Sequence, residues 1–302
     1  MSLCLESGET LSYGLQRMVL EQFDTCLRHL EDPEKNTGNT VHDTRKRLKK
    51  VRAVLRMVRV ENSRELFRKE NACLRDAGRN LAEIRDSAVR IQTLDRLVRH
   101  AGDRLSENPF AEIRSYFEEM HRLTVRRFCE NSRILPDTAD VIREAKTRVR
   151  SWADVPDRFS AVGEGMRRVY RKGKAALETA YRDPMDDHFH EWRKRAKYLW
   201  YHTRILRPLW PGLMKSLAEE IHTLTECLGE DHDLAVLHGF VNDADRSTPS
   251  VKQNLLFELI RQRQQEIRAA ARPLGERIYA ETPADFTDRI YAYWNIWRNK
   301  AE

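Results

Sequence analysis

The sequence predicts an all-α protein, and three observations support this fold class. Leu, Arg, Glu and Ala recur throughout the 302 residues, whereas glycine, which weakens helices, occurs only 12 times. No segment shows the sustained alternation of apolar and polar residues that is typical of a half-buried strand. Ten prolines separate amphipathic segments, and pairs such as Asp183-Pro184 and Thr282-Pro283 place a capping residue before a proline at the first helical position.

The apolar periodicity and the prolines together predict twelve helices, six on each side of Val155-Pro156. In chain order we expect them at about 11–31, 40–60, 63–83, 86–101, 109–130, 137–153, 158–181, 185–207, 211–228, 232–245, 250–280 and 285–300. Prolines mark most of these boundaries, at positions 33, 109, 136, 156, 184, 208, 211, 249 and 283. Because the connections are short, successive helices should be antiparallel neighbours, as in a helical bundle.

The composition indicates a cellular compartment and a class of binding partner. The net charge of +7 points to an anionic partner, and eight Lys or Arg lie between His42 and Arg59 against one acid, Asp43. The first residues lack the basic and apolar segments of a signal peptide, and no stretch approaches the roughly 18 apolar residues of a membrane helix. The five cysteines include no Cys-x-x-Cys pair, so we expect reduced thiols. These features predict a cytoplasmic protein with no membrane segment, metal site or cofactor.

An internal repeat divides the chain into two related parts. His42-x-x-Arg45-Lys46-x-x-Lys49 recurs as His190-x-x-Arg193-Lys194-x-x-Lys197, at an offset of 190 − 42 = 148. The segment 81–89, LAEIRDSAV, recurs at 228–236 as LGEDHDLAV, at an offset of 228 − 81 = 147. Two matches at nearly the same separation indicate a duplicated helical unit. We therefore expect two pseudo-symmetric halves, residues 1–155 and 156–302, with His42 and His190 at equivalent places on the second helix of each.

Both copies of the first motif place cations on one helical face. At about 100° per residue, the first face collects His42, Arg45, Lys46, Lys49, Arg52 and Arg56. The second collects His190, Arg193, Lys194, Lys197, Tyr201 and Arg204, whereas Trp192 and Trp200 point away from it. Such a row of like charges destabilises an isolated helix, which favours a polyanionic ligand. A histidine among these cations should be neutral until phosphate arrives.

Simpler interpretations stay open at these positions. A basic helical face can be only a solvated surface, although solvation does not require the same spacing twice. Asp86 and Asp233 are placed near predicted helix starts, where they could cap the helix or pair with a basic residue. The histidines that lack a repeated counterpart are expected to be structural or on the surface.

The same residues resemble the CHAD family (conserved histidine α-helical domain), from about Gln16 to Ile278. The segments VHDTRKRLKKVR at 41–52 and FHEWRKRAKYL at 189–199 are similar to the two basic helices of the family that contain a conserved histidine. The segment LGEDHDLAV at 228–236 is similar to its "LG-x-x-x-D-L-x-V" block. The first-half counterpart, Ile84-Arg85-Asp86-Ser87, departs from that block, which leaves the role of Arg85 open.

The resemblance implies one CHAD-like domain, in which two halves resembling four-helix bundles surround a basic pore or cleft. It also implies binding of inorganic polyphosphate without catalytic residues, association with polyphosphate granules and with partner proteins there, and a place for His232 in the site. Two other functions remain as alternatives. A metal-dependent phosphohydrolase of the HD type would use His232 and Asp233 with further ligands. A nucleic-acid-binding protein would need stacking aromatics on the basic faces, where only Tyr201 is expected.

Overall fold

The computed structural model confirms the all-α class. It describes residues 3–32, 37–58, 64–102, 105, 109–131, 133–150, 155–244 and 251–299. Arg59 and Pro249, which the sequence analysis used, lie outside these ranges. Within them the chain forms eleven α-helices and one short 3₁₀ helix, and no strand.

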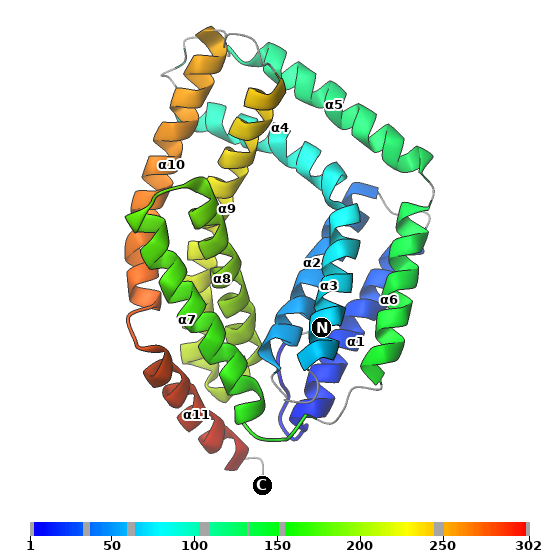
Figure 1. The fold of residues 1–302 in the computed structure, drawn as a ribbon, viewed down its shortest axis with the longest axis vertical. Coiled ribbons are helices and arrows are strands. Elements are labelled where there is room, and N and C mark those ends of the chain that lie inside the picture. The colour runs from blue at the N-terminus through cyan, green and yellow to red at the C-terminus, as the bar shows by residue number, and fades with distance from the viewer. Residues whose placement is uncertain are drawn as a thin grey trace.

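The helices follow the expected order and lie in three groups in Figure 1. Helices α1, α2, α3 and α6 form the right side of the view, α7 to α11 form the left side, and α4 and α5 cross between them at the top. The bounds are α1 (Leu11–Leu30), α2 (Thr37–Met57), α3 (Arg64–Asn80), α4 (Ala82–Ala101), α5 (Ala111–Glu130), α6 (Ile134–Arg150), α7 (Ser160–Arg182), α8 (Asp186–Ile205), η3 (Arg207–Leu209), α9 (Pro211–Ala244), α10 (Val251–Ile278) and α11 (Pro283–Asn299).

The main difference from the sequence prediction is α9. The expected helices 211–228 and 232–245 form one continuous helix of 34 residues. Leu228, Leu234 and Leu237 are buried at helical spacing, and this packing maintains the helix across Gly229. The placement of Asp233 near a helix start is therefore wrong. In the first copy of the repeat, the chain does break, at Leu81 between α3 and α4.

Two of the predicted proline-linked caps give different outcomes. Thr282 does cap α11, since its Oγ1 accepts from the amide of Asp285 at 3.2 Å, and Pro283 is the first helical residue. Asp183 instead follows the last residue of α7, and the extended residue Met185 occupies the position before α8. Proline therefore occupies the first helical position in α11, whereas α8 starts two residues after Pro184.

Close backbone packing and one buried histidine fix α2 against α7 and α8. A Cβ on Gly165 of α7 would lie 2.0 Å from the carbonyl oxygen of Met57, so only glycine permits this approach to the end of α2. His202 of α8 is fully buried, and its Nε2 donates to the carbonyl oxygen of Ala53 on α2 at 3.0 Å. Burial lowers the pKa of His202 to about 4, so the imidazole is neutral at neutral pH. These contacts bring the two basic helices together.

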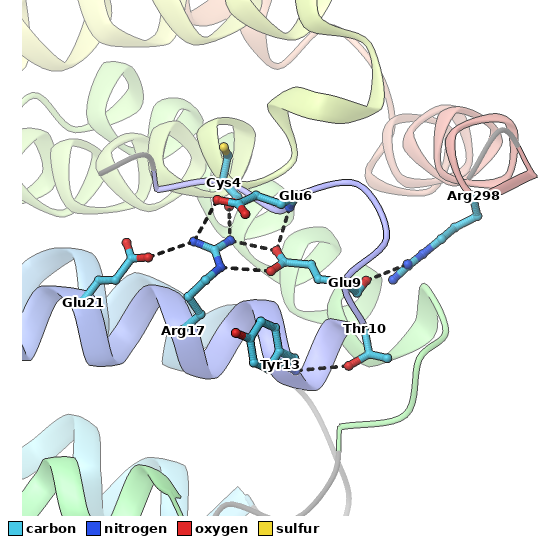
Figure 2. A network of polar contacts seen from close by, with 8 residues as sticks. All are labelled: Cys4, Glu6, Glu9, Thr10, Tyr13, Arg17, Glu21 and Arg298. Atoms are coloured by element: carbon cyan, nitrogen blue, oxygen red, sulfur yellow. Dashed lines mark hydrogen bonds and ion pairs between the residues drawn. The ribbon is translucent and has the colours of Figure 1, made fainter. Parts of the chain in front are cut away.

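The N-terminal segment ties α1 to the ends of α8 and α11. The amide of Leu5 donates to the carbonyl oxygen of Ile205 at 3.0 Å. Arg17 of α1 donates to the carbonyl oxygen of Cys4 at 3.0 Å and to both carboxylate oxygens of Glu9 at 2.8 and 2.9 Å (Figure 2). Arg298 of α11 donates to the carbonyl oxygen of Glu9 at 2.8 Å. Arg17 thus connects this segment to α1, and Arg298 connects it to α11.

Replacing Arg17 by alanine should lower the free energy of unfolding by roughly 2–3 kcal/mol. The side chain of Glu9 is only 6% exposed, so its charge would be left buried without its main partner. Urea denaturation monitored by circular dichroism measures the loss. The double variant Arg17→Ala with Glu9→Gln should recover part of it, because the buried charge is removed. No recovery in the double variant would mean that the ion pair does not account for the effect.

Candidate anion-binding site

The basic faces of α2 and α8 lie close enough for their cations to repel one another. Lys49 of α2 experiences the positive charges of Arg193 and Lys197 of α8. Lys197 in turn experiences Lys46, and Lys50 experiences Arg204. The structure therefore brings the two copies of the repeated motif together, although 148 residues separate them in the chain.

Two lysines of α2 show the strength of this positive field. The side chain of Lys49 keeps contact with solvent, and its partial burial together with the charges of Arg193, Arg45 and Lys197 lowers its pKa to about 8. Burial and the charge of Arg47, with smaller effects from Arg204 and Lys46, lower the pKa of Lys50 to about 8 as well. A lysine loses basicity in this way where burial disfavours its charged form and the nearby cations outnumber the acids that could balance them.

Three histidines adjoin the cations, as expected. The rings of His190 on α8 and His232 on α9 lie 4.1 Å apart between centroids. Burial, Arg193, His190 and Lys49 lower the pKa of His232 to about 3, and burial with Lys194 and Arg193 lowers that of His190. Burial and Arg85 lower the pKa of His42. All three imidazoles are therefore neutral at neutral pH and can take up a proton when an anion enters.

The repeated aspartates form ion pairs. Asp86 of α4 accepts from Arg45 at 3.4 Å, and the same guanidinium donates to the carbonyl oxygen of Leu81 at 3.1 Å. Asp233 of α9 accepts from Arg96 of α4 at 3.1 Å. Of the two interpretations left open, the ion pair is confirmed for both residues. Arg45 consequently has a structural role at the break between α3 and α4 in addition to its charge.

Beyond Lys49, the predicted face of α2 is used for packing. Arg52 donates to the side-chain oxygen of Asn71 on α3 at 3.1 Å. The guanidinium of Arg56 lies 4.1 Å from the ring centroid of Tyr198 on α8 and donates to the carbonyl oxygen of Arg52 at 2.8 Å. Burial lowers the pKa of Arg56 to about 10. These two arginines therefore join α2 to its neighbours.

Two aromatic residues on α8 have the opposite orientations to those predicted. Tyr201 was expected on the basic face, but it is only 2% exposed, and burial raises its pKa to about 12. Trp200, expected to point away, has Lys197 and Arg204 at 4.5 and 4.8 Å from its ring centroid and His222 of α9 at 4.8 Å. The reason is that neighbouring elements enclose the last turns of α8, where Ile205 and Leu206 are buried as well as Tyr201, so only the Trp200 side remains accessible.

Lys194 and Arg204 both remain at the surface of α8. Lys194 is exposed and pairs with Glu191 one turn earlier in the helix, and Arg204 is half-buried beside Trp200. A phosphate that binds Lys194 would have to compete with the carboxylate of Glu191.

A pocket of about 630 Å³ adjoins His42 and contains residues that the sequence pattern did not assign. It is lined by Gly38, Asn39, His42, Ile84, Arg85, Ala88, Gln92, His121 and Val125. Arg85, whose role the sequence left open, acts electrostatically on His42 here. His121 has no repeated counterpart, and its Nδ1 lies 2.8 Å from Ser87 Oγ. Only the three-dimensional packing of α4 and α5 reveals these two residues.

The described part of the chain contains no cluster of three or more His, Cys, Asp or Glu side chains arranged to hold a metal ion. Within the same ranges, none of the helices combines the length and the apolar character needed to cross a bilayer.

Comparison with known proteins gives a family match and several similar structures, of which two are described here. The family model described as the CHAD domain matches residues 17–242. The structure of PptA from Streptomyces chartreusis matches with a TM-score of 0.59 at 15% identity, and covers 90% of this chain and 100% of that one. The crystal structure of the CHAD domain from the plant Ricinus communis matches with a TM-score of 0.54 at 16% identity, over 93% and 94% of the two chains. No curated protein matches in sequence. At these identities the structural matches indicate a shared fold.

Proposed function

Because this chain belongs to the CHAD family, we propose that it binds inorganic polyphosphate without catalysing its conversion. The polyphosphate chain would lie between α2 and α8 and contact His42, Arg45, Lys46, Lys49, His190, Arg193, Lys194, Lys197 and, on α9, His232. Arg52, Arg56 and Arg204 would extend the positive surface at its edge. Tyr201, which is buried, is excluded from this set.

The observation that carries this proposal is the unbalanced positive charge between the two helices. Lys49 lies among Arg45, Arg193 and Lys197, and burial together with these positive charges lowers its pKa to about 8. A linear anion with one charge on each phosphate would relieve this repulsion and release the counterions bound along its own length. A small neutral substrate would do neither. The repulsion therefore favours a polyanion as the ligand.

We also propose that the duplication provides the two sides of the site. Residues 1–155 and 156–302 would form two bundle-like halves related by an approximate twofold axis, with α2 and α8 on either side of a basic pore or cleft. Supporting this, His42 and His190 lie near the starts of α2 and α8, and each of these helices packs against the helix before it and the helix after it. Such a module could hold the protein at cytoplasmic polyphosphate granules, where partner proteins would meet it.

The electrostatics around His232 disfavour the HD-type phosphohydrolase. A divalent cation at this imidazole would face Arg193 and Lys49, and these charges, together with burial, lower the pKa of the ring to about 3. Metal analysis of the purified protein and a phosphatase assay test the alternative. Stoichiometric Mn, Fe or Zn together with turnover of a phosphate ester would contradict a purely binding role.

Nucleic-acid binding deserves a direct test because of Trp200, an accessible aromatic at the basic surface. Its ring already contacts Lys197, Arg204 and His222, so these groups would have to move before a base could stack on it.

We expect long-chain polyphosphate to displace a labelled DNA or RNA oligomer, and the reverse competition to fail, at equal phosphate concentration. Polyphosphate carries its charges at a higher density and needs no stacking platform. Fluorescence anisotropy measures both directions, and polyphosphates of defined length in the same assay give the site size. Efficient displacement of polyphosphate by the oligomer would identify nucleic acid as the better ligand.

A further inference from the structure

The pocket of about 630 Å³ beside His42 is enclosed by one face of each of three helices. Its lining residues recur at helical spacing on α2, on α4 and on α5, so each helix presents a single face to the enclosed space. The volume lies in the range of pockets that hold small organic ligands. The lining residues are Gly38, Asn39 and His42 of α2, Ile84, Arg85, Ala88 and Gln92 of α4, and His121 and Val125 of α5.

The charge of this pocket is positive. All of its lining residues lie in the described ranges, and none of them is acidic. The side chain of Arg85 makes no hydrogen bond or ion pair with any described residue, and its charge acts on His42. The first turn of α2 also lines the pocket, so the positive end of that helix dipole adds to the charge. An anion in the pocket would therefore find an arginine that no carboxylate of the described chain already engages.

Ser87 holds the ring of His121 at the pocket. The side chain of Ser87 is buried, and its hydroxyl donates to the carbonyl oxygen of Ile84 at 3.0 Å. Because that contact uses the single hydroxyl proton, the Nδ1 of His121 is the donor to the Ser87 oxygen at 2.8 Å. The Nε2 of the ring makes no hydrogen bond to a described residue. It can therefore take up a proton and donate it to a phosphate oxygen.

Part of the pocket wall is apolar. Ile84, Ala88 and Val125 contribute only hydrocarbon to the lining. Inorganic phosphate and polyphosphate have no apolar surface that could cover these side chains. A ligand that joins an anionic group to an apolar body would use both parts of the wall, because it would remove hydrocarbon from water as well as bind the arginine.

The two copies of the repeat differ at this point. Arg85 occupies the position of His232, since 232 − 147 = 85. His190 and His232 pack ring to ring with centroids 4.1 Å apart, whereas His42 and Arg85 line the pocket. The departure from the repeat thus coincides with the pocket, which indicates a role that belongs to the first half.

We propose that this pocket is a second anion site and binds a small phosphate monoester with an apolar body. The phosphate would contact Arg85, His42 and the Nε2 of His121, and the apolar body would lie along Ile84 and Val125. This binding does not depend on the function proposed above. One consequence does rest on it. Because His42 is also assigned to the polyphosphate site, the monoester should compete with polyphosphate for this imidazole.

The test measures the binding of three probes by isothermal titration calorimetry. We expect phenyl phosphate to bind about tenfold more tightly than inorganic phosphate, because only phenyl phosphate can cover the apolar wall. Phenol, which has the apolar body without the phosphate, should show no measurable binding. Val125→Ser should reduce the preference for phenyl phosphate over inorganic phosphate and leave the contacts of the phosphate group in place.

Four further variants locate the binding of phenyl phosphate. Arg85→Gln and His121→Gln should each weaken it about tenfold, since each removes one charge-assisted contact. Arg127→Ala removes an exposed charge of the same helix as His121 and should have little effect. Lys197→Ala, which alters the proposed polyphosphate site on α8, should also leave phenyl phosphate binding unchanged. Circular dichroism checks that each variant keeps its helix content.

Different results would overturn the ligand class, the location and the consequence. If inorganic phosphate binds as tightly as phenyl phosphate, the apolar wall is not used and an organic monoester is the wrong ligand. If Arg85→Gln and His121→Gln both bind phenyl phosphate normally, the ligand lies outside the pocket. If phenyl phosphate binds in the pocket and polyphosphate affinity does not change, the competition at His42 is wrong. A protein that binds phenyl phosphate in the pocket but no polyphosphate would contradict only the function proposed above.

Discussion

Replacing Arg45, Lys49, Arg193 and Lys197 by alanine is expected to weaken polyphosphate binding by a hundredfold or more. These four cations lie on the facing surfaces of α2 and α8, and each charge-assisted contact to phosphate contributes on the order of 1 kcal/mol or more. Fewer counterions would be released on binding, so the dependence of log K on log salt concentration should flatten as well. A polyphosphate titration at several salt concentrations measures both effects.

A matched control removes four charges away from the two helices. Arg127 of α5, Arg171 and Lys172 of α7, and Arg261 of α10 are all exposed, and their replacement by alanine changes the net charge equally. An alternative set distributed along the chain is less suitable. Arg114, Lys252 and Arg298 form ion pairs, and Arg104 lies outside the described residues. If both quadruple variants weaken binding equally, binding depends only on general electrostatic attraction and not on a specific site between α2 and α8.

Loss of folding has to be separated from loss of binding, because Arg45 also holds the break between α3 and α4. Its guanidinium donates to the carbonyl oxygen of Leu81, and the alanine variant would leave that contact unmade. A triple variant of Lys49, Arg193 and Lys197 keeps this bond and should still lose most of the affinity. Alanine favours helix and relieves the repulsion, so the triple variant should keep its helix content and unfold at the same temperature or slightly above.

Polyphosphate affinity should fall about tenfold between pH 7 and pH 9 at constant ionic strength. Lys49 and Lys50 have pKa values of about 8 in the free protein, and a bound polyanion would raise both. The complex then holds more protons than the free protein, so affinity decreases as pH rises through the free values. Calorimetric titrations in buffers of different ionisation enthalpy count the protons taken up. The terminal phosphates of polyphosphate also titrate in this pH range. A long polyphosphate is therefore required, because its end groups carry only a small part of the total charge.

Two variants separate the groups responsible for this pH dependence. Lys49→Arg with Lys50→Arg should flatten the decrease above pH 7, because guanidinium groups stay charged there. The triple change of His42, His190 and His232 to glutamine should abolish any further gain in affinity between pH 7 and pH 5. Affinity that does not change with pH in the unaltered protein would contradict the proton uptake.

On acidification the free energy of unfolding of the free protein should fall, whereas polyphosphate affinity should rise. The pKa values of His202 and His232 are lowered to about 4 and about 3, so the unfolded chain binds protons at these positions from pH 6.5 downwards while the folded chain does not. Folding is therefore destabilised as the pH falls from about 6.5 towards these values. Polyphosphate should offset part of the loss at His232, and none of it at His202, which α2 and α8 enclose.

The sequence predicted the helical class, most helix positions and the cation cluster, because these depend on local periodicity and on the repeat. The segment 42–49 repeats at 190–197, and the structure brings both copies together. The sequence predictions were wrong where packing between helices determines the structure. The continuity of α9 across Gly229 depends on its buried leucines, and the burial of Tyr201 depends on packing that a helical projection does not include. A helical projection cannot represent neighbours from other elements, which is also why Arg85, Arg96 and His121 were not assigned.

The most direct test of the proposed site is a crystal structure of the protein with a polyphosphate of defined length. We expect consecutive phosphates between α2 and α8, with oxygens within hydrogen-bonding distance of Lys49 and Lys197 and of the Arg193 guanidinium, and with His190 and His232 directed towards the chain. Phosphates bound on a different surface, with the space between the two helices free of ligand, would contradict the account.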